Sequence, residues 1–338
     1  MSDCRILPPH ILEAIVRNGT PQQRRRALAT LAISERLRGR REVLALSLAP
    51  VPAGEKRRTV YDAQHATRLP GVLVRGEGDP DSADAAVNEA YDGAGETYDF
   101  YAETYGRNSI DGRGMRIDST VHYGVQYDNA FWDGAQMVYG DGDGELFERF
   151  TRSVDVIGHE LTHGVTDSEA ALEYHDQPGA LNESLSDVFG SLVKQRVRQQ
   201  AAAEADWIIG EGLFTPRVRG VGLRSLKAPG SAYSDPILGN DPQPSHMSNY
   251  DRSPEDNGGV HVNSGIPNHA FYLAAVAIGG FAWEKAGRIW YVAATERLRP
   301  RSDFAAAARA TQAVAGELFG AGGAEQEAVR DAWSQVGL

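Results

Sequence analysis

Cysteine is nearly absent from this sequence: Cys4 is the only one in 338 residues, so no disulfide can form within the chain. Long apolar runs are also missing. No stretch approaches the 18 or more apolar residues of a membrane helix, and the start of the chain lacks a basic segment followed by an apolar core. We therefore expect no membrane partner, and either secretion by a route without a visible signal peptide or a cytoplasmic location until release.

Basic residues are also fewer than acidic residues. The chain has 34 Lys and Arg residues against 46 Asp and Glu residues, which gives a net charge of -12. A general nucleic-acid binder needs basic surface to contact phosphates, so this balance excludes that class and predicts no nucleic-acid partner. The length exceeds that of a usual single core, which predicts more than one lobe.

The N-terminal part, residues 1–50, has the features of a separate and detachable segment. A helix is predicted to start near Pro9, and Thr20 and Pro21 have the N-cap and N1 residue types that open a second, basic helix. A Pro/Gly-rich linker flanked by basic residues follows, and exposed linkers of this kind are common protease sites. The pattern predicts a small helical segment that a protease removes.

The rest of the chain divides into a β-rich lobe at 51–190 and a helical lobe at 191–338. Short runs with β-branched and aromatic residues, bounded by Gly and Asp, predict strands in the first lobe. One long helix is predicted between these strands, at about 82–105. Further helices are predicted at 154–168, 180–200, 264–279, 281–297, 302–319 and 322–336. A β-rich lobe followed by a helical lobe defines an α+β fold.

The run HELTH contains a candidate metal site. His159 and His163 are four residues apart, so on a helix they share one face and can bind one metal ion, with Glu160 beside it. Imidazole ligands suit zinc, and a catalytic zinc site leaves one position open for water. Two ordinary surface histidines on a helix are the alternative, because so short a pattern also occurs by chance.

A carboxylate on a second helix strengthens the metal interpretation. Glu183 follows His159 by 24 residues and completes a set of two histidines and one glutamate. Asp187, four residues further on, shares its face and could accept the free N–H of a ligand histidine, which orients the ring.

A third segment supplies His261 after a Gly-Gly turn, with Asp256 five residues before it. A histidine oriented by an acid is suited to stabilise a developing oxyanion. His269 is expected to be a packing or surface residue, and the sequence indicates no role for His122 or His175.

In this order the three segments resemble the thermolysin family of zinc metallopeptidases. The resemblance covers about 58–338 and is carried by VHYGVQYDNAFWDGAQMVYGDGDG, HELTHGVTD, NESLSD and DNGGVHVNSGIPN. The N-terminal segment, with its PPHIL, is similar to the short propeptides of the protealysin branch. The resemblance implies a two-lobe fold with the active-site cleft between the lobes, and a latent precursor.

The resemblance also implies a role for each matching residue. The zinc ligands would be His159, His163 and Glu183, with Glu160 as the general base. The oxyanion would be held by Tyr174 and His261, with Asp256 behind His261. Asp187 would support His159, and the Asn182 backbone would support His163. Substrate would be bound by Asn129, Ala130 and Arg224, and by the apolar pocket of Phe147, Phe150, Val156 and Leu223. This pocket predicts cleavage before large hydrophobic residues in protein or peptide substrates.

Two expectations concern further ligands. The positions that match thermolysin's double calcium site are Asp155, Lys194, Asp206, Ile208 and Glu211. Lys194 and Ile208 replace acidic ligands there, so we expect no double calcium site. Cys4 is either an unconnected thiol or an additional zinc ligand of the precursor, because a thiolate binds zinc more strongly than water does.

Two other functions could use the same zinc motif. A catalytically silent zinc-binding or interaction protein on the same scaffold would have no reason to keep Glu160 between the histidines. An aminopeptidase would need a site for the free amine of its substrate, and no sequence feature indicates one. The sequence predicts a zinc endopeptidase whose own segment 1–50 acts as an intramolecular inhibitor.

Overall fold

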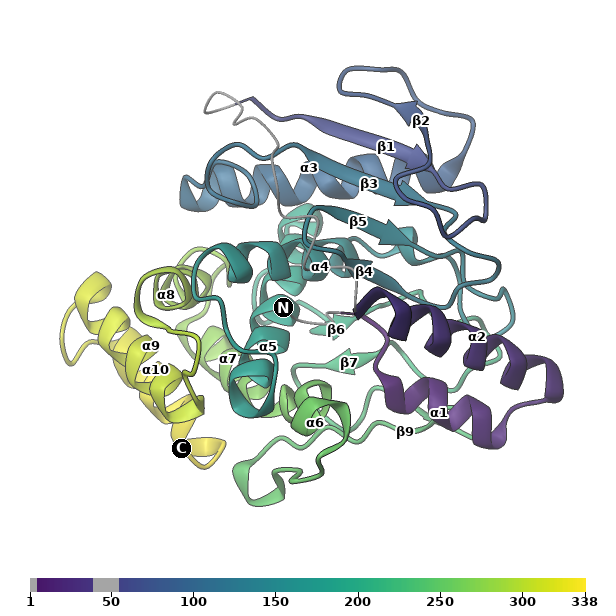
Figure 1. Cartoon of the computed structure of the whole chain (residues 1–338). Helices are drawn as coiled ribbons and strands as arrows, with labels where there is room; N and C mark the ends of the chain where they lie inside the picture. Colours follow the sequence, from purple (N-terminus) through teal and green to yellow (C-terminus); the bar gives the residue numbers. More distant parts are fainter. Residues whose placement is uncertain (1–4, 39–54) are drawn as a thin grey trace.

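A computed structural model describes residues 5–38 and 55–338 of the chain, without the side chains of 35–38. Figure 1 shows a sheet with a long helix at the top, a group of helices at the lower left, and a pair of short helices at the lower right. The predicted α+β class is confirmed. Cys4 and most of the predicted linker lie outside the described residues.

One sheet of five strands forms the core of the first lobe, in the order β2-β1-β3-β5-β4. The two inner pairings, β1 with β3 and β3 with β5, are parallel, and the two outer pairings are antiparallel. The strand bounds are β1 (Arg58–Asp62), β2 (Val72–Arg75), β3 (Ile117–Val121), β4 (Ala130–Trp132) and β5 (Gln136–Tyr139).

Two helices connect this sheet to the active-site region. Helix α3 (Ala85–Tyr105) packs against β1 and β3 on one side and against α4 (Val154–Ser168) on the other. The Asp84 side chain caps the start of α3, and Gly106 ends it in the left-handed region with φ of 71°. Nearly all of α4 is buried, and it also contacts β4. Helix α4 is therefore held rigidly at the base of the sheet.

Helix α5 (Asp176–Arg198), which crosses the expected lobe boundary between 190 and 191, packs along α4 more extensively than any other pair of elements in the described chain. It leads into the helical lobe. Its remaining helices are α6 (Glu255–Asn263), α7 (Gly265–Ile278), α8 (Ala286–Val292), α9 (Phe304–Phe319) and α10 (Ala324–Gln335). Short strands lie between α5 and α6 in the chain: β6 (Ile208–Ile209) pairs with β7 (Arg224–Ser225), and β8 (Ser234–Asp235) with β9 (Gly239–Asn240).

The elements that differ from the sequence expectations include β4, α5 and α8, and helix α6 and strands β6 to β9 were not predicted at all. Strand β4 was not predicted, because its three residues are too few to show an alternating pattern. Helix α5 begins at Asp176 rather than 180, since the residue pattern before 180 contains Pro and Gly. The helix expected at 281–297 starts only at Ala286 and ends in a π-helical turn over Ala293–Arg297.

The N-terminal segment contacts both lobes. Helices α1 (Pro9–Asn18) and α2 (Pro21–Arg38) form a hairpin, and the residues before them run antiparallel to β4 through a bridge between Arg5 and Phe131. Five of its apolar side chains are at most 1% exposed and join the main core: Ile6, Leu7, Ile11, Leu12 and Ile15. The first helix of the segment is predicted correctly, and the segment is docked rather than loose.

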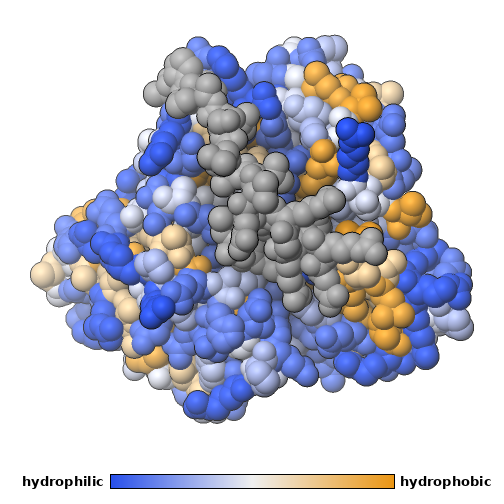
Figure 2. Space-filling view, viewed as in Figure 1, coloured by the Kyte–Doolittle hydropathy of each residue, from blue (hydrophilic) through white to orange (hydrophobic). Residues whose placement is uncertain are grey.

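Most of the surface in Figure 2 is hydrophilic. An orange patch at the upper right coincides with the place of β2 in Figure 1, where Val72, Leu73 and Val74 are exposed. Among the described residues, no helix is long and apolar enough to cross a membrane.

Candidate active site

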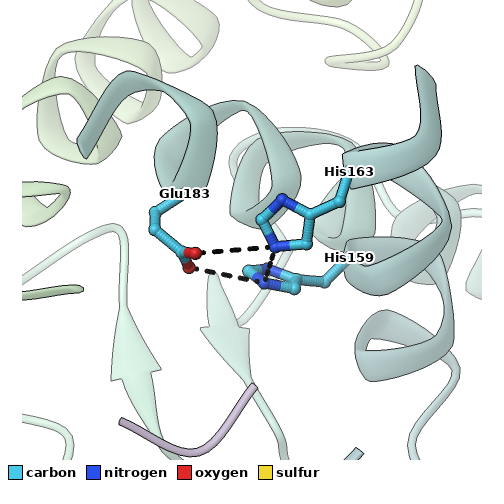
Figure 3. Close-up of side chains that lie close together, drawn as sticks. All are labelled: His159, His163 and Glu183. Carbon is cyan, nitrogen blue, oxygen red and sulfur yellow. Dashed lines mark hydrogen bonds and ion pairs between the residues drawn. The ribbon is translucent and has the colours of Figure 1, made fainter. Parts of the chain in front are cut away.

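Two adjacent helices bring the three candidate ligands together. Figure 3 shows His159 and His163 projecting from α4 towards Glu183 on α5. The two Nε2 atoms lie 3.1 Å apart, and the carboxylate oxygens of Glu183 lie 3.5 Å from His159 Nε2 and 3.6 Å from His163 Nε2. All three side chains are at most 1% exposed.

This donor set fits a zinc ion. One donor atom from each of the three residues lies within 4.8 Å of the others, so a single ion could contact all three. Two imidazole nitrogens and one carboxylate are the protein ligands of a catalytic zinc site that leaves one position open. Burying three titratable side chains so close together would cost free energy unless a cation were bound between them. Cys4, the expected additional ligand, lies outside the described residues.

The other ring nitrogen of each histidine has its own partner. His159 Nδ1 lies 2.8 Å from Asp187 Oδ1. His163 Nδ1 lies 2.8 Å from the side-chain Oδ1 of Asn182 and 3.0 Å from the Ser186 hydroxyl. The contact with Asn182 thus involves the side chain, whereas the resemblance implied the backbone. These partners orient both Nε2 atoms towards Glu183.

Asp187 also contacts two residues beyond the histidine. Arg224 donates to it from Nε at 2.8 Å and from Nη2 at 2.8 Å, and Asn268 donates from Nδ2 at 2.8 Å. Burial would raise the pKa of Asp187, but the charges of Arg224 and His159 and their hydrogen bonds outweigh it and hold the pKa far below its ordinary value. Asp187 is therefore a carboxylate, as its support of His159 requires.

Glu160 lies next to the three ligands without being one of them. Its side chain is fully buried, and its Oε2 accepts a hydrogen bond of 2.9 Å from the backbone N–H of Trp132 at the end of β4. This bond ties the carboxylate of α4 to the strand that forms the edge of the cleft. Glu160 is thus held in a fixed position beside the cluster.

His261 and Tyr174 contact the cluster through Glu183. His261 Nδ1 lies 2.8 Å from Asp256 Oδ1, and its Nε2 lies 3.3 Å from the Tyr174 hydroxyl, which also donates to Glu183. Burial lowers the pKa of His261, but the charges of Asp256 and Glu183 outweigh it and raise the pKa to about 9. A protonated His261 and a tyrosine hydroxyl are two donors suited to a developing oxyanion.

An unusual backbone run positions His261. Four consecutive residues, from Asp256 to Gly259, have φ between 52° and 83°, in the left-handed region. Gly258 and Gly259 adopt it without strain. The tight turn returns the chain so that both the N–H and the ring of His261 reach the Asp256 carboxylate.

The N-terminal segment occupies the cleft in an extended form. Its backbone is held by the residues that the resemblance assigns to substrate. The Ile6 N–H donates to Ala130 O at 3.3 Å, and Arg224 Nη1 donates to Ile6 O at 2.9 Å. Asn129 accepts from the Leu7 N–H at 3.0 Å and donates to Leu7 O at 3.3 Å.

The carbonyl oxygen of Arg5 lies 3.1 Å from His261 Nε2, at the candidate oxyanion position. The Arg5–Ile6 peptide bond thus takes the place expected of a bond to be cleaved. Ile6 follows it and is fully buried in the same apolar cluster as the four expected pocket residues, all at most 1% exposed: Phe147, Phe150, Val156 and Leu223.

The region that matches the double calcium site contains an ammonium group. Lys194 Nζ lies 3.0 Å from Asp155 Oδ2 and 2.8 Å from Asp206 Oδ1, and donates to Ile208 O at 2.5 Å. Burial lowers the pKa of Lys194, but the two carboxylates outweigh it and raise the pKa. Glu211 pairs instead with Arg198 at 2.6 Å.

Sequence reasoning missed several residues of the site. Ser186 lies three positions after Glu183, so its place on the inner face of α5 could have been read from helical spacing. Asn268, fully buried against Asp187, gave no such signal, because it comes from a distant helix. His269, expected to be a packing residue, lies 3.2 Å from Leu226 O and stacks near Tyr272.

A zinc-binding cluster between a β-rich lobe and a helical lobe defines a class of metallopeptidase, and the comparisons agree with it. Residues 53–167 match the family model of the thermolysin metallopeptidase catalytic domain, and residues 170–338 match that of its alpha-helical domain. The chain belongs to the thermolysin metallopeptidase family.

Within this family the chain is similar to short precursors. The solved precursor of protealysin from Serratia proteamaculans is 52% identical, covers 99% of both chains and gives a TM-score of 0.92. An extracellular metalloprotease of Pectobacterium carotovorum subsp. carotovorum is 51% identical over 99% of this chain and 96% of its own length. Thermolysin of Alicyclobacillus acidocaldarius is 43% identical over 82% of this chain, which spans 50% of that protein.

Proposed function

We propose that this metallopeptidase is a neutral zinc endopeptidase made as a latent precursor, which hydrolyses internal peptide bonds before large hydrophobic residues. One observation supports it above the others: an extended peptide, residues 5–7, lies in the cleft with its backbone held by Asn129, Ala130 and Arg224. These contacts use only groups that every peptide has. The cleft is therefore shaped for polypeptide.

Each residue around the cluster would have a separate role in peptide hydrolysis. A zinc ion, when bound, lowers the pKa of a water to about 7 and polarises a carbonyl group. Glu160 would take the proton of the attacking water as general base, from the position fixed by the Trp132 N–H. Tyr174 and His261 would donate to the carbonyl oxygen as it becomes negative, with Asp256 keeping the His261 ring oriented.

Specificity would come mainly from the residue after the cleaved bond. Ile6 follows the Arg5–Ile6 bond and is fully buried, and the four expected pocket residues are all apolar and buried: Phe147, Phe150, Val156 and Leu223. Burying a large aliphatic or aromatic side chain there contributes about 1.5–3 kcal/mol. Substrates with leucine, isoleucine or phenylalanine after the cleaved bond should therefore be preferred.

Latency would come from the N-terminal segment, residues 1–50. Residues 5–7 fill the cleft, and α1 and α2 hold them there. The catalytic unit that remains would comprise lobes at 51–190 and 191–338. A relative named as an extracellular metalloprotease supports release from the cell before activation.

Cys4 would act as an additional zinc ligand in this latent form. Cys4 directly precedes Arg5 in the sequence, and the carbonyl oxygen of Arg5 lies 3.1 Å from His261 Nε2. Zinc binding would lower the pKa of the thiol and make it a thiolate. Thiol labelling of zinc-loaded and zinc-stripped precursor tests this: slower labelling with zinc supports it, and equal labelling in both states rejects it.

The overall proposal is tested by incubating the purified full chain with casein, with and without a chelator, while its N-terminus is sequenced over time. Casein hydrolysis that the chelator abolishes, together with loss of the N-terminal segment, is the expected result. The alternative, a catalytically silent zinc-binding protein, predicts bound zinc with no hydrolysis after the segment is removed.

A further inference from the structure

Helix α2 places a row of three polar side chains on the catalytic unit. Arg26, Thr30 and Ser34 are four residues apart and so lie on one face of the helix. The Thr30 Oγ1 accepts from the Asp128 N–H at 3.4 Å, and the Ser34 hydroxyl lies 3.1 Å from that of Tyr127. The row therefore runs beside the loop that leads into Asn129 and β4.

Arg26 inserts a guanidinium group among carboxylates of the catalytic unit. Its Nη1 lies 3.2 Å from Glu145 Oε2 and 3.6 Å from Asp143 Oδ2. The other oxygen of Asp143 accepts backbone N–H groups from three consecutive residues, 145–147, which fixes the carboxylate in place. The site for this cation is thus built into a rigid loop.

Asp128 is a third carboxyl group of this site. It is only 2% exposed, and its Oδ1 has no hydrogen-bond partner among the described residues. Burial and the neighbouring charge of Asp143 raise its pKa well above the ordinary value, and the charge of Arg26 opposes them. Arg26 is thus the cation that acts on all three carboxyl groups, those of Asp128, Asp143 and Glu145.

The carboxyl groups lie beside the path of a bound peptide. Asp128 is adjacent in sequence to Asn129, whose side chain holds both backbone atoms of Leu7. Counted from the Arg5–Ile6 bond, Leu7 occupies the second position after the cleaved bond, and Pro8 the third. Removal of the N-terminal segment would take Arg26 away and leave these carboxyl groups without its counter-charge.

We propose that Asp128, Asp143 and Glu145 form a subsite of the mature enzyme for an arginine or lysine side chain two or three residues after the cleaved bond, which Arg26 occupies in the precursor. The inference rests on the proposed peptidase function and adds a charge preference to the apolar one. In the precursor, the guanidinium group of Arg26 already lies among the acidic side chains of this loop, so the two are complementary in charge. The cation sits on the segment that would leave on activation.

A basic side chain fits this site better than a divalent metal ion does. One oxygen of Asp143 is already engaged by three N–H groups, and Arg217 lies 3.5 Å from the other oxygen of Glu145. Little carboxylate oxygen remains for the six to eight ligands that calcium takes. Guanidinium, by contrast, is bound through directional N–H bonds to two or three oxygens.

The experiment uses the full chain, loaded with zinc and freed of its N-terminal segment by self-processing or by limited proteolysis in the basic linker. Quenched fluorescent peptides carry leucine after the cleaved bond and Arg, Gln or Glu at the second or third position after it. We expect kcat/KM to be about three- to tenfold higher for Arg than for Gln at one of these positions, mainly through KM, and lower for Glu.

Two variants separate the subsite from a structural effect. Glu145→Gln should reduce the Arg-to-Gln ratio, and Glu145→Lys should reverse the preference towards Glu, which loss of stability could not do. Glu325→Gln, which removes a remote carboxylate paired with Lys285, should leave the ratio unchanged. Equal rates for Arg and Gln peptides at both positions overturn this inference alone. Failure to cleave any peptide overturns the peptidase function and this inference with it.

Discussion

Asp187 links the metal site to the substrate site through Arg224. The aspartate lies 2.8 Å from His159 Nδ1 and accepts two hydrogen bonds from the guanidinium, which in turn holds the carbonyl of Ile6. All of these side chains are at most 2% exposed. Peptide binding and zinc-ligand orientation therefore share one buried carboxylate.

The first prediction concerns this shared carboxylate. Asp187→Asn should weaken zinc affinity about 10- to 100-fold, because the amide no longer supplies a negative acceptor to His159. It should also loosen Arg224 and raise KM for peptides. Competition with a chromogenic zinc chelator measures the first effect. Asp99→Asn, a change in a half-exposed carboxylate on α3, is the control, and equal zinc affinity in both variants would contradict the link.

The second prediction concerns the general base. Glu160→Ala should lower kcat about 10²- to 10⁴-fold while the protein keeps its zinc and its fold, because the residue is not a ligand. His159→Ala and Glu183→Ala should lose the metal as well. Zinc content by atomic absorption, measured beside peptide hydrolysis, separates the two classes. Native activity of the Glu160 variant would show that the mechanism is wrong.

The third prediction concerns calcium. Lys194 places its ammonium group between Asp155 and Asp206, so the melting temperature should change little in millimolar calcium. Lys194→Ala leaves Asp155 buried without its counter-charge, which should cost about 3–5 kcal/mol of stability. Calcium should partly restore the melting temperature of this variant. A large calcium-dependent rise in the unaltered protein, absent with a chelator, would refute the prediction.

The fourth prediction concerns pH and docking of the N-terminal segment. His10 on α1 is partly buried, with its Nε2 3.0 Å from the Tyr233 hydroxyl. Burial lowers its pKa to about 4; the charge of Asp256 opposes this, while His261, Arg224 and Arg17 add to it. The docked form therefore requires neutral His10. Docking is strongest above the pKa of about 6.5 of a free histidine and weakens as the pH falls towards 4.

Lowering the pH from 7 to 5 should accordingly reduce the equilibrium constant for docking on the order of twentyfold. The measurement is the rate at which a protease, active over this range, removes the segment from a Glu160→Ala precursor, which cannot process itself. His10→Gln keeps a polar side chain near Tyr233 but cannot titrate, so its removal rate should depend less on pH. Identical pH profiles for the two precursors would rule out His10 as the responsive group.

Several features of this protein can be predicted from its sequence alone. The spacing of His159 and His163 was sufficient to place both on one face of α4, since helical periodicity is a local property. The helices around them were long and periodic enough to predict within a few residues. Resemblance to a known family supplied Tyr174, Arg224 and Asn129, which no local pattern would have selected.

Only the tertiary structure decided which distant groups meet. The short strand β4 has no sequence signal, yet it provides the edge along which residues 5–7 run. Asn268 contacts Asp187, and Arg26 contacts Asp143 and Glu145, although the partners lie far apart in the sequence. Helical or strand periodicity gives no information about such pairs. Such contacts depend on how helices and strands pack, because burial and pairing are properties of the assembled fold and not of any one segment.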